Sequence, residues 1–162
     1  MSKLRDAIAY ICMNLHSDRA LSKARLTKLL YLADWKSAVD HGEPISDIEW
    51  EFNHFGPYVH DVIDTVQADP HFRVEHKKTT SGDAVDIVRC VGSPSVDQLD
   101  EGDRSALDFA IAKARDLPYP EFKRMVYGTF PIISQPRYSK LRLADLARRY
   151  KSELSAASPQ RY

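Results

Sequence analysis

The sequence predicts an α+β fold that is mainly α-helical: a compact bundle of about six helices around a central buried helix, with a small antiparallel sheet of two to three strands. Three observations support this prediction. The segment from Leu21 to about Gly42 has apolar residues on two neighbouring helical faces, which is more than a surface helix needs. Several other segments place apolar residues every three or four positions, as helices with one buried face do. Between Ile48 and His54 this period changes to two, which is typical of a half-buried strand.

The segment after Leu21 is the expected central helix. Ser22 can act as its N-cap, and Gly42 follows the last periodic residues, where a glycine ends many helices. Burying one Leu side chain stabilises a fold by about 1.5–3 kcal/mol, so this helix should contribute much of the core. Its apolar residues are Leu26, Leu29, Leu30 and Ala33 on one face and Leu32, Trp35 and Val39 on the next.

The elements on either side of the central helix follow from local signals. A first helix is expected from an N-cap at Ser2 to about Leu15. After the strand around Trp50, Gly56 and Pro57 suit the N-cap and the first position of another helix. This helix is predicted to end near Asp69, and its inner face to consist of Val59, Val62, Ile63 and Val66.

Two more short strands are predicted at 72–77 and 84–91, and the turn composition of 80–83 joins them as a hairpin. We expect them to form one sheet with the strand around Trp50.

The C-terminal half is predicted to be mainly helical. Acidic residues at the start of a helix after Pro94 complement its dipole, and a short helix around Phe122 should end at Gly128. Residues 129–137 are expected to form an extended loop packed on the core. The remaining predictions are a last helix at 139–153, one domain over 1–153 and a flexible tail over 154–162.

Composition limits the classes of protein. The chain has 162 residues, 43% of them hydrophobic and 28% charged, as in an ordinary globular domain. No apolar run approaches the roughly 20 residues of a membrane helix, and the N-terminus does not resemble a signal peptide. Cys12 and Cys90 are too few for a disulfide framework or a structural zinc site, and Cys12 is expected to be a buried, inert thiol. These features predict a cytoplasmic protein with no membrane partner.

The net charge is zero, but its distribution is uneven. Residues 137–162 hold seven Lys or Arg and two acidic residues. This excess suits either an anionic partner or a solvated last helix that neutralises an acidic body. One alternative function is therefore a nucleic-acid-binding regulator that uses the basic residues Arg142, Arg148, Arg149 and Lys151.

Motifs for catalysis are weak. His60 lies four residues before Asp64, within side-chain reach on a helix, and His54 is close in sequence, so a metal-assisted hydrolase is a third alternative. The sequence has no H-E-x-x-H, no G-x-S-x-G and no glycine-rich phosphate loop. The prediction is a protein that is not an enzyme and has no cofactor, catalytic residue or metal site.

A family resemblance covers most of the chain, from about Leu4 to Lys151. The segments that carry it are Leu26–Asp34 (LTKLLYLAD), Gly42–Ile45 (GEPI), Trp50–Pro57 (WEFNHFGP) and Tyr127–Pro131 (YGTFP), followed by the leucine-rich helix after Leu141. In order and spacing they resemble the Panacea domain, also called the SocA-like antitoxin domain. Many members carry a separate N-terminal segment for binding DNA or a partner, whereas here the resemblance begins at Leu4.

The resemblance implies a mainly helical domain with a small sheet that acts as an antitoxin in bacteria or phages. Such proteins are encoded beside diverse toxins and neutralise them by direct protein contact. Delivery of the toxin to a protease is a variant that the sequence does not separate from occlusion, and a homo-oligomer stays open. The aromatic residue in His54-Phe55-Gly56-Pro57 stands where relatives vary, so the identity of the toxin is not carried over.

Aromatic side chains dominate the hot spots of protein interfaces, and outward acidic residues would suit a basic toxin. We therefore predict toxin contacts around the central helix and the first strand. Trp50 and Phe52 are also expected to face the core, so the outward role falls mainly on Lys28, Tyr31 and Trp35 and on the polar face of the strand. The candidate toxin-binding residues are Lys28, Tyr31, Trp35, Glu49, Trp50, Glu51, Phe52, Asn53, His54, Phe55 and Tyr58.

Overall fold

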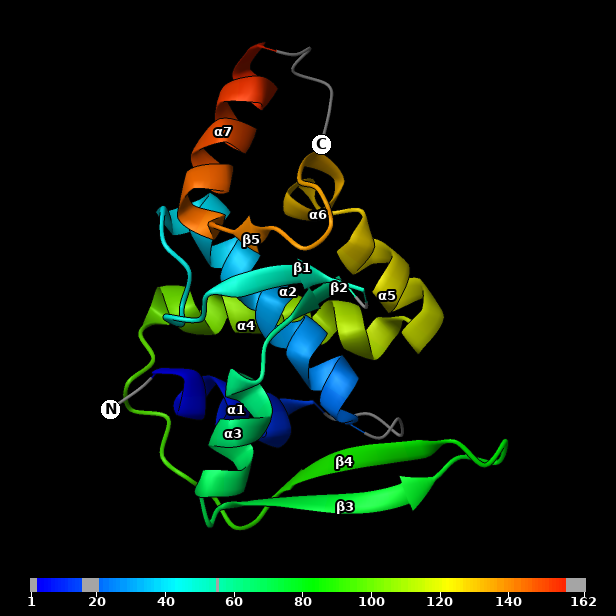
Figure 1. Cartoon of the computed structure of the whole chain (residues 1–162). Coiled ribbons are helices and arrows are strands. Elements are labelled where there is room, and N and C mark those ends of the chain that lie inside the picture. The colour runs from blue at the N-terminus through cyan, green and yellow to red at the C-terminus, as the bar shows by residue number, and fades with distance from the viewer. Residues whose placement is uncertain (1–2, 16–20, 55, 157–162) are drawn as a thin grey trace.

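The computed structural model describes residues 3–15, 21–54 and 56–156, and within these ranges the chain forms seven helices and five strands (Figure 1). The predicted class, α+β and mainly helical, is confirmed. The helices are α1 (Lys3–Asn14), α2 (Lys23–His41), α3 (Asp61–Ala68), α4 (Glu101–Asp116), α5 (Tyr119–Tyr127), α6 (Phe130–Ser134) and α7 (Leu143–Ala156). The strands are β1 (Trp50–Asn53), β2 (Gly56–Tyr58), β3 (Phe72–Lys78), β4 (Ala84–Cys90) and β5 (Lys140–Leu141).

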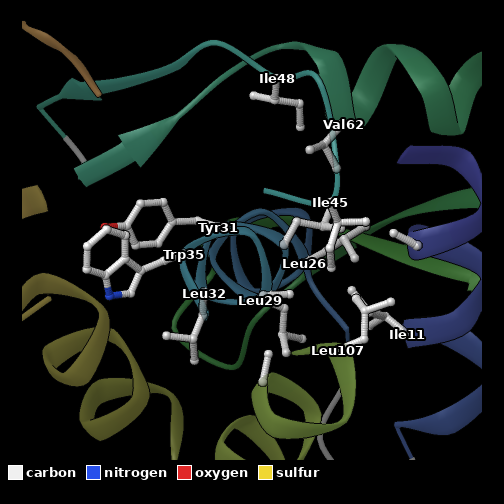
Figure 2. Close-up of a cluster of buried hydrophobic side chains, with 14 of the residues drawn as sticks. Ile11, Leu26, Leu29, Tyr31, Leu32, Trp35, Ile45, Ile48, Val62 and Leu107 are labelled. Atoms are coloured by element: carbon white, nitrogen blue, oxygen red, sulfur yellow. The ribbon is translucent and has the colours of Figure 1, made fainter. Parts of the chain in front are cut away.

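Helix α2 lies at the centre of the fold, as predicted (Figure 1). The side-chain oxygen of Ser22 accepts a hydrogen bond from the backbone N–H of Arg25, and Gly42 ends the helix with a left-handed φ of 87°. Figure 2 shows its side chains leaving the helix in several directions, toward Ile11 of α1, Leu107 of α4 and the segment around Ile45. A helix that is apolar on most of its circumference must be covered from several sides.

The first sheet has the order β2-β1-β5 and is antiparallel. The prediction of a helix starting at Gly56 and Pro57 is wrong, because these residues return the chain as strand β2, with Asn53 opposite Gly56. Gly56 has a φ of +90°, which other residues rarely adopt, and the ring of Tyr127 lies against its Cα. Pro57 is tolerated because β2 is an edge strand. Helix α3 begins only at Asp61.

Strands β3 and β4 form a second sheet of their own, which corrects the prediction that they join β1. Strand β1 pairs instead with β5, which has two residues and is too short to show a period. The β3–β4 hairpin is anchored at the base of α2, where the N–H of Val88 donates to the carbonyl of Leu21 over 2.9 Å. Its far end points away from the helices (Figure 1).

The segment after α5 also differs from the expectation. Residues 129–137 are not an extended loop throughout, since Phe130–Ser134 form the short helix α6, in which Ile132 is buried. Helix α7 starts later than predicted because residues 140–141 belong to β5, and it continues to Ala156. The predicted cap at Ser2 and the tail beyond 156 lie outside the described residues. None of the helices in the described part of the chain is long and apolar enough to cross a membrane.

Candidate partner-binding surface

Four of the predicted toxin-binding residues lie in the core. The exposed fraction is 5% for Lys28, 0% for Tyr31, 7% for Trp35 and 1% for Trp50. The expectation that Lys28, Tyr31 and Trp35 point outward is therefore wrong, whereas burial of Trp50 was expected. The physical reason is that α2 is covered on nearly every side, so it has no broad outer face.

The buried aromatic residues join α2 to its neighbours. The rings of Tyr31 and Trp50 meet edge to face at 5.6 Å between centroids, which connects α2 to β1. Trp35 stacks on Phe130 of α6 at 6.4 Å and contacts Tyr150 of α7 at 5.6 Å. Figure 2 shows Tyr31 and Trp35 on the same side of the helix. Aromatic pairs of this kind contribute about 0.5–1.5 kcal/mol beyond their buried area, so these residues stabilise the fold.

Asp34 is a buried carboxylate that the sequence did not single out. It accepts hydrogen bonds from the backbone N–H groups of Ile45 and Ser46, both at 3.1 Å, from the Ser46 hydroxyl and from the Trp50 indole at 2.9 Å. Complete burial raises the pKa of Asp34 to about 6, although the hydrogen bonds from Ser46 and Trp50 oppose this shift. The carboxylate fixes the connector between α2 and β1, and so positions the sheet.

The other candidates are more accessible. Glu49, Glu51 and His54 are exposed, and Glu49 lies 3.9 Å from the ammonium group of Lys140. Phe52, Asn53 and Tyr58 are half-buried. Phe55 lies outside the described residues. The role of these residues in binding a toxin stays a prediction.

Beside Phe52 lies a pair of residues that the sequence analysis missed, and we call Phe52, Arg137 and Tyr138 the Tyr138 surface. The Arg137 guanidinium lies 5.7 Å from the centre of the Phe52 ring. Tyr138 is 73% exposed and has a φ of 71°, which it shares with no other non-glycine residue in the described ranges. A bulky residue in this region costs about 1–2 kcal/mol, and pairing with β1 holds it there, since the Tyr138 N–H donates to the Phe52 carbonyl.

A cavity of about 480 Å³ lies between α2, α5 and the β1–β2 hairpin. We call it the lysine–tyrosine cavity, after its lining by Lys23, Lys28, Lys123, Tyr58, Tyr119 and Tyr127. Burial, with the nearby charge of Lys123, lowers the pKa of Lys28 to about 8. The sequence signal for this site is Lys28, a lysine between the apolar residues Leu26 and Leu29 of α2.

A second hollow of about 570 Å³ borders β5 and the connector before β1. Its charged lining is mixed, with Glu43, Asp47, Glu49 and Asp145 against Lys140 and Arg142. The four acidic residues outnumber the two basic ones, so this hollow does not favour an anionic ligand.

The basic residues of α7 are partly neutralised by their own helix. Arg148 pairs with Asp145, and the guanidinium of Arg149 lies 3.3 Å from the Glu153 carboxylate and 5.4 Å from the centre of the Phe130 ring. A nucleic-acid interface needs arginines that are available to phosphates. These contacts favour the interpretation of α7 as a solvated helix that packs on the body.

The metal site considered from the sequence rests on His54, His60 and Asp64. His60 is exposed and its ring meets Tyr58 edge to face at 5.2 Å. Within residues 3–15, 21–54 and 56–156, no three His, Cys, Asp or Glu side chains are grouped so that they could hold a metal ion.

Comparison with known proteins gives one match. The family model described as "Antitoxin SocA-like, Panacea domain" matches residues 26–130, which run from α2 to the start of α6. Neither the curated proteins nor the solved structures compared with the chain gave a match. The matched range holds the buried Asp34, the β1–β2 hairpin and most of the lysine–tyrosine cavity, whereas Arg137 and Tyr138 follow it.

Proposed function

Because the chain belongs to the family of SocA-like antitoxins with a Panacea domain, we propose that it is the antitoxin of a toxin–antitoxin system and neutralises a cognate protein toxin by direct binding. Family membership is the observation that carries this proposal. Both partners would meet in the cytoplasm, and the toxin would be encoded beside this chain. Neutralisation by occlusion needs no chemistry from the antitoxin, only a surface that covers the working surface of the toxin.

We place the centre of the contact at the Tyr138 surface. Tyr and Arg are enriched among residues that dominate binding energy, and Tyr138 and Arg137 are both exposed next to a half-buried phenylalanine. Backbone strain that is held by neighbouring pairing often marks a functional position. The exposed acidic residues Glu49 and Glu51 would lie at the rim, where they would steer a basic toxin. A stable complex buries about 800 Å² on each partner, so the full contact would extend over neighbouring elements.

The first experiment is co-expression with the product of the adjacent gene. We expect that product to stop growth alone, growth to recover when the chain is present, and the two proteins to elute together in gel filtration. A product that is harmless alone, or that forms no complex with the chain, would contradict the proposal.

The location of the contact is tested by Tyr138→Asn. Asparagine tolerates a positive φ, so the fold should keep its stability while the aromatic ring is lost. We expect the complex to weaken by at least about tenfold, measured by calorimetric titration, with an unchanged midpoint of thermal unfolding. Arg137→Ala should weaken it in the same way, whereas Arg73→Ala, an exposed arginine on β3, serves as the control. If all variants bind the toxin with equal affinity, the Tyr138 surface is not the centre of the contact.

Delivery of the toxin to a protease is a second mechanism of neutralisation. It differs in one measurable result: the amount of toxin in the cell would fall when the chain is co-expressed. Under occlusion the toxin would stay at its original amount and remain bound. Immunoblotting of a tagged toxin after protein synthesis is stopped would separate the two.

A further inference from the structure

The lysine–tyrosine cavity is built by three separate parts of the chain. Helix α2 contributes Lys23, Ala24, Thr27 and Lys28, helix α5 contributes Tyr119, Lys123 and Tyr127, and the hairpin contributes Asn53, Pro57 and Tyr58. On α5 the three residues are four apart, so they share one face of the helix. The volume of about 480 Å³ lies within the range of small-ligand sites, which is about 300–1,000 Å³.

The charge of this cavity has one sign. Three lysines line it, and none of the described residues that line it is acidic. The exposed fraction of Lys28 is 5%. Its ammonium group has no ion pair or hydrogen bond to any residue that the structure describes. A cation that is largely shielded from water and has no anion beside it is unfavourable in a protein. The low pKa of about 8 for Lys28 has the same cause, since burial and the charge of Lys123 both disfavour the charged form.

Aromatic rings hold the ammonium groups in place and supply flat, apolar walls. The Lys28 nitrogen lies 5.8 Å from the centre of the Tyr119 ring, and the Lys123 nitrogen lies 5.5 Å from the centre of the Tyr127 ring. Burial raises the pKa of Tyr119 and Tyr127, so their hydroxyl groups stay neutral at physiological pH, and the hydroxyl of Tyr119 can donate a hydrogen bond to an anion.

The number of cations decides which anion fits best. A single carboxylate would leave most of the positive charge in the cavity uncompensated. A phosphate group carries about −1.5 to −2 charges at neutral pH and presents three acceptor oxygens. Lysine ammonium groups bind phosphate as point charges, and three of them line the cavity.

From this geometry we propose that the lysine–tyrosine cavity binds a small phosphate-bearing ligand, with the phosphate held by Lys28 and Lys123 and the remainder of the molecule packed against the tyrosine rings. The lining of this cavity and the Tyr138 surface share no residue, although the charge of Arg137 reaches Tyr127, so each proposal is tested by its own variants. The proposal can therefore succeed or fail whether or not a toxin is bound.

Calorimetric titration of the full chain with four probes tests this proposal: pyrophosphate, adenosine 5′-monophosphate, adenosine and acetate. We expect the two phosphate-bearing probes to bind and adenosine and acetate to bind at least about tenfold more weakly. Lys28→Met and Lys123→Met should each weaken phosphate binding by about tenfold or more. The matched controls are Lys36→Met on α2, which pairs with Asp40 over 3.2 Å, and Arg124→Met on α5, which does not line the cavity.

A second measurement does not depend on affinity. The Lys28 side chain, followed by NMR of its Cε, should titrate near pH 8 in the free protein. Bound pyrophosphate should move this midpoint upward, because a nearby anion stabilises the ammonium form.

Three results would overturn the proposal. The first is that neither phosphate-bearing probe shows binding at concentrations up to about 10 mM. The second is that Lys28→Met and Lys123→Met bind the phosphate-bearing probes as tightly as the control variants do. Because Lys123 is exposed, its replacement should leave the fold intact, so the result for this variant reports on binding. The third is that acetate or a synthetic acidic peptide binds more tightly than pyrophosphate, which would assign the cavity to a carboxylate of a protein partner.

Discussion

Asp34 shows at the scale of a single residue how one side chain positions the sheet. All its hydrogen-bond donors lie on the segment 45–50, which follows the central helix in the sequence. The carboxylate therefore converts a connector without regular structure into a fixed support for β1. A carboxylate in the middle of an apolar helix is a signal that the sequence does contain, but its donors become visible only in the fold.

Replacing Ser46 by Ala tests this support. The variant loses the hydroxyl that donates to Asp34 and accepts from the Ile48 N–H at 3.3 Å. We expect the free energy of unfolding, measured in urea, to fall by about 1–3 kcal/mol, because a buried charged acceptor loses a donor. Ser105→Ala, at an exposed position of α4, should change it by less than about 0.5 kcal/mol. A loss no larger than that of Ser105→Ala would contradict the role of Ser46.

The same carboxylate makes stability depend on pH. Burial raises the pKa of Asp34 from 3.8 to about 6 on folding. Because the folded-state pKa is the higher one, the contribution of Asp34 to stability is fully present below pH 3.8 and is lost as pH rises through about 6. This rise of the Asp34 pKa corresponds to roughly 3 kcal/mol of stability.

The direction of the Asp34 pKa shift is measured by carbon-detected NMR of its carboxyl group between about pH 3 and pH 8. A midpoint near 6 is expected, and Asp69, whose pKa is held at about 2 mainly by the backbone N–H of His71, should stay ionised over this range. A midpoint for Asp34 below that of an unfolded aspartate would reverse the predicted dependence on pH.

At the scale of elements, the β1–β2 hairpin shows where local signals stop being sufficient. Gly56 and Pro57 suit the start of a helix as well as an edge strand, and the sequence favoured the helix. The decision is made by distant residues: β1 offers free backbone groups, and the ring of Tyr127 packs on Gly56. By contrast, the ends of α2 at Ser22 and Gly42 were predicted correctly, since caps depend on neighbours within a few residues.

Gly56→Ala tests the contact that fixes the hairpin. The added Cβ would both meet the Tyr127 ring and sit at a φ of +90°, so we expect a loss of about 2–4 kcal/mol in urea unfolding. Gly82→Ala is the matched control: its φ is +89°, but nothing lies within 4 Å of the new Cβ, so only the backbone strain of about 1 kcal/mol should appear. If the two variants lose equal stability, the Tyr127 contact contributes nothing.

At the scale of the whole molecule, the last helix is held to the central helix largely through rings. Tyr150 contacts Trp35 at 5.6 Å and Phe130 at 5.2 Å, and Leu143, Leu146 and Ala147 are buried beside them. Helix α7 is thus part of the body rather than an appended basic segment. This agrees with the pairing of Arg148 and Arg149 on its outer side.

Tyr150→Ala should therefore destabilise the entire domain. We expect the free energy of unfolding to fall by about 1–3 kcal/mol, because a half-buried ring is lost from a cluster of three. Lys151→Ala, at the next and exposed position, should leave the unfolding curve in place. A separate, earlier transition for α7 in the variant would show instead that the helix unfolds on its own.

The fold was predictable to a greater extent than the candidate site. Helix positions follow from apolar periodicity, but the pairing of β1 with β5 joins residues 50 and 141, which no local pattern connects. Exposure was misjudged for Tyr31 and Trp35 because the covering elements come from other parts of the chain. The lysine–tyrosine cavity likewise joins residues of 23–28, 53–58 and 119–127, so the sequence shows its charges without showing that they meet.

Trp35 and Trp50, the chain's two tryptophans, sit at different joints of the molecule, one against α6 and α7 and the other beside Asp34. The two tryptophans are therefore intrinsic fluorophores that report on different parts of the fold. Replacing either one by phenylalanine leaves a single emitter whose colour follows the hydration of one joint. Stopped-flow fluorescence of the two variants during unfolding would show whether the first sheet or helix α7 separates from the central helix first, without an added dye.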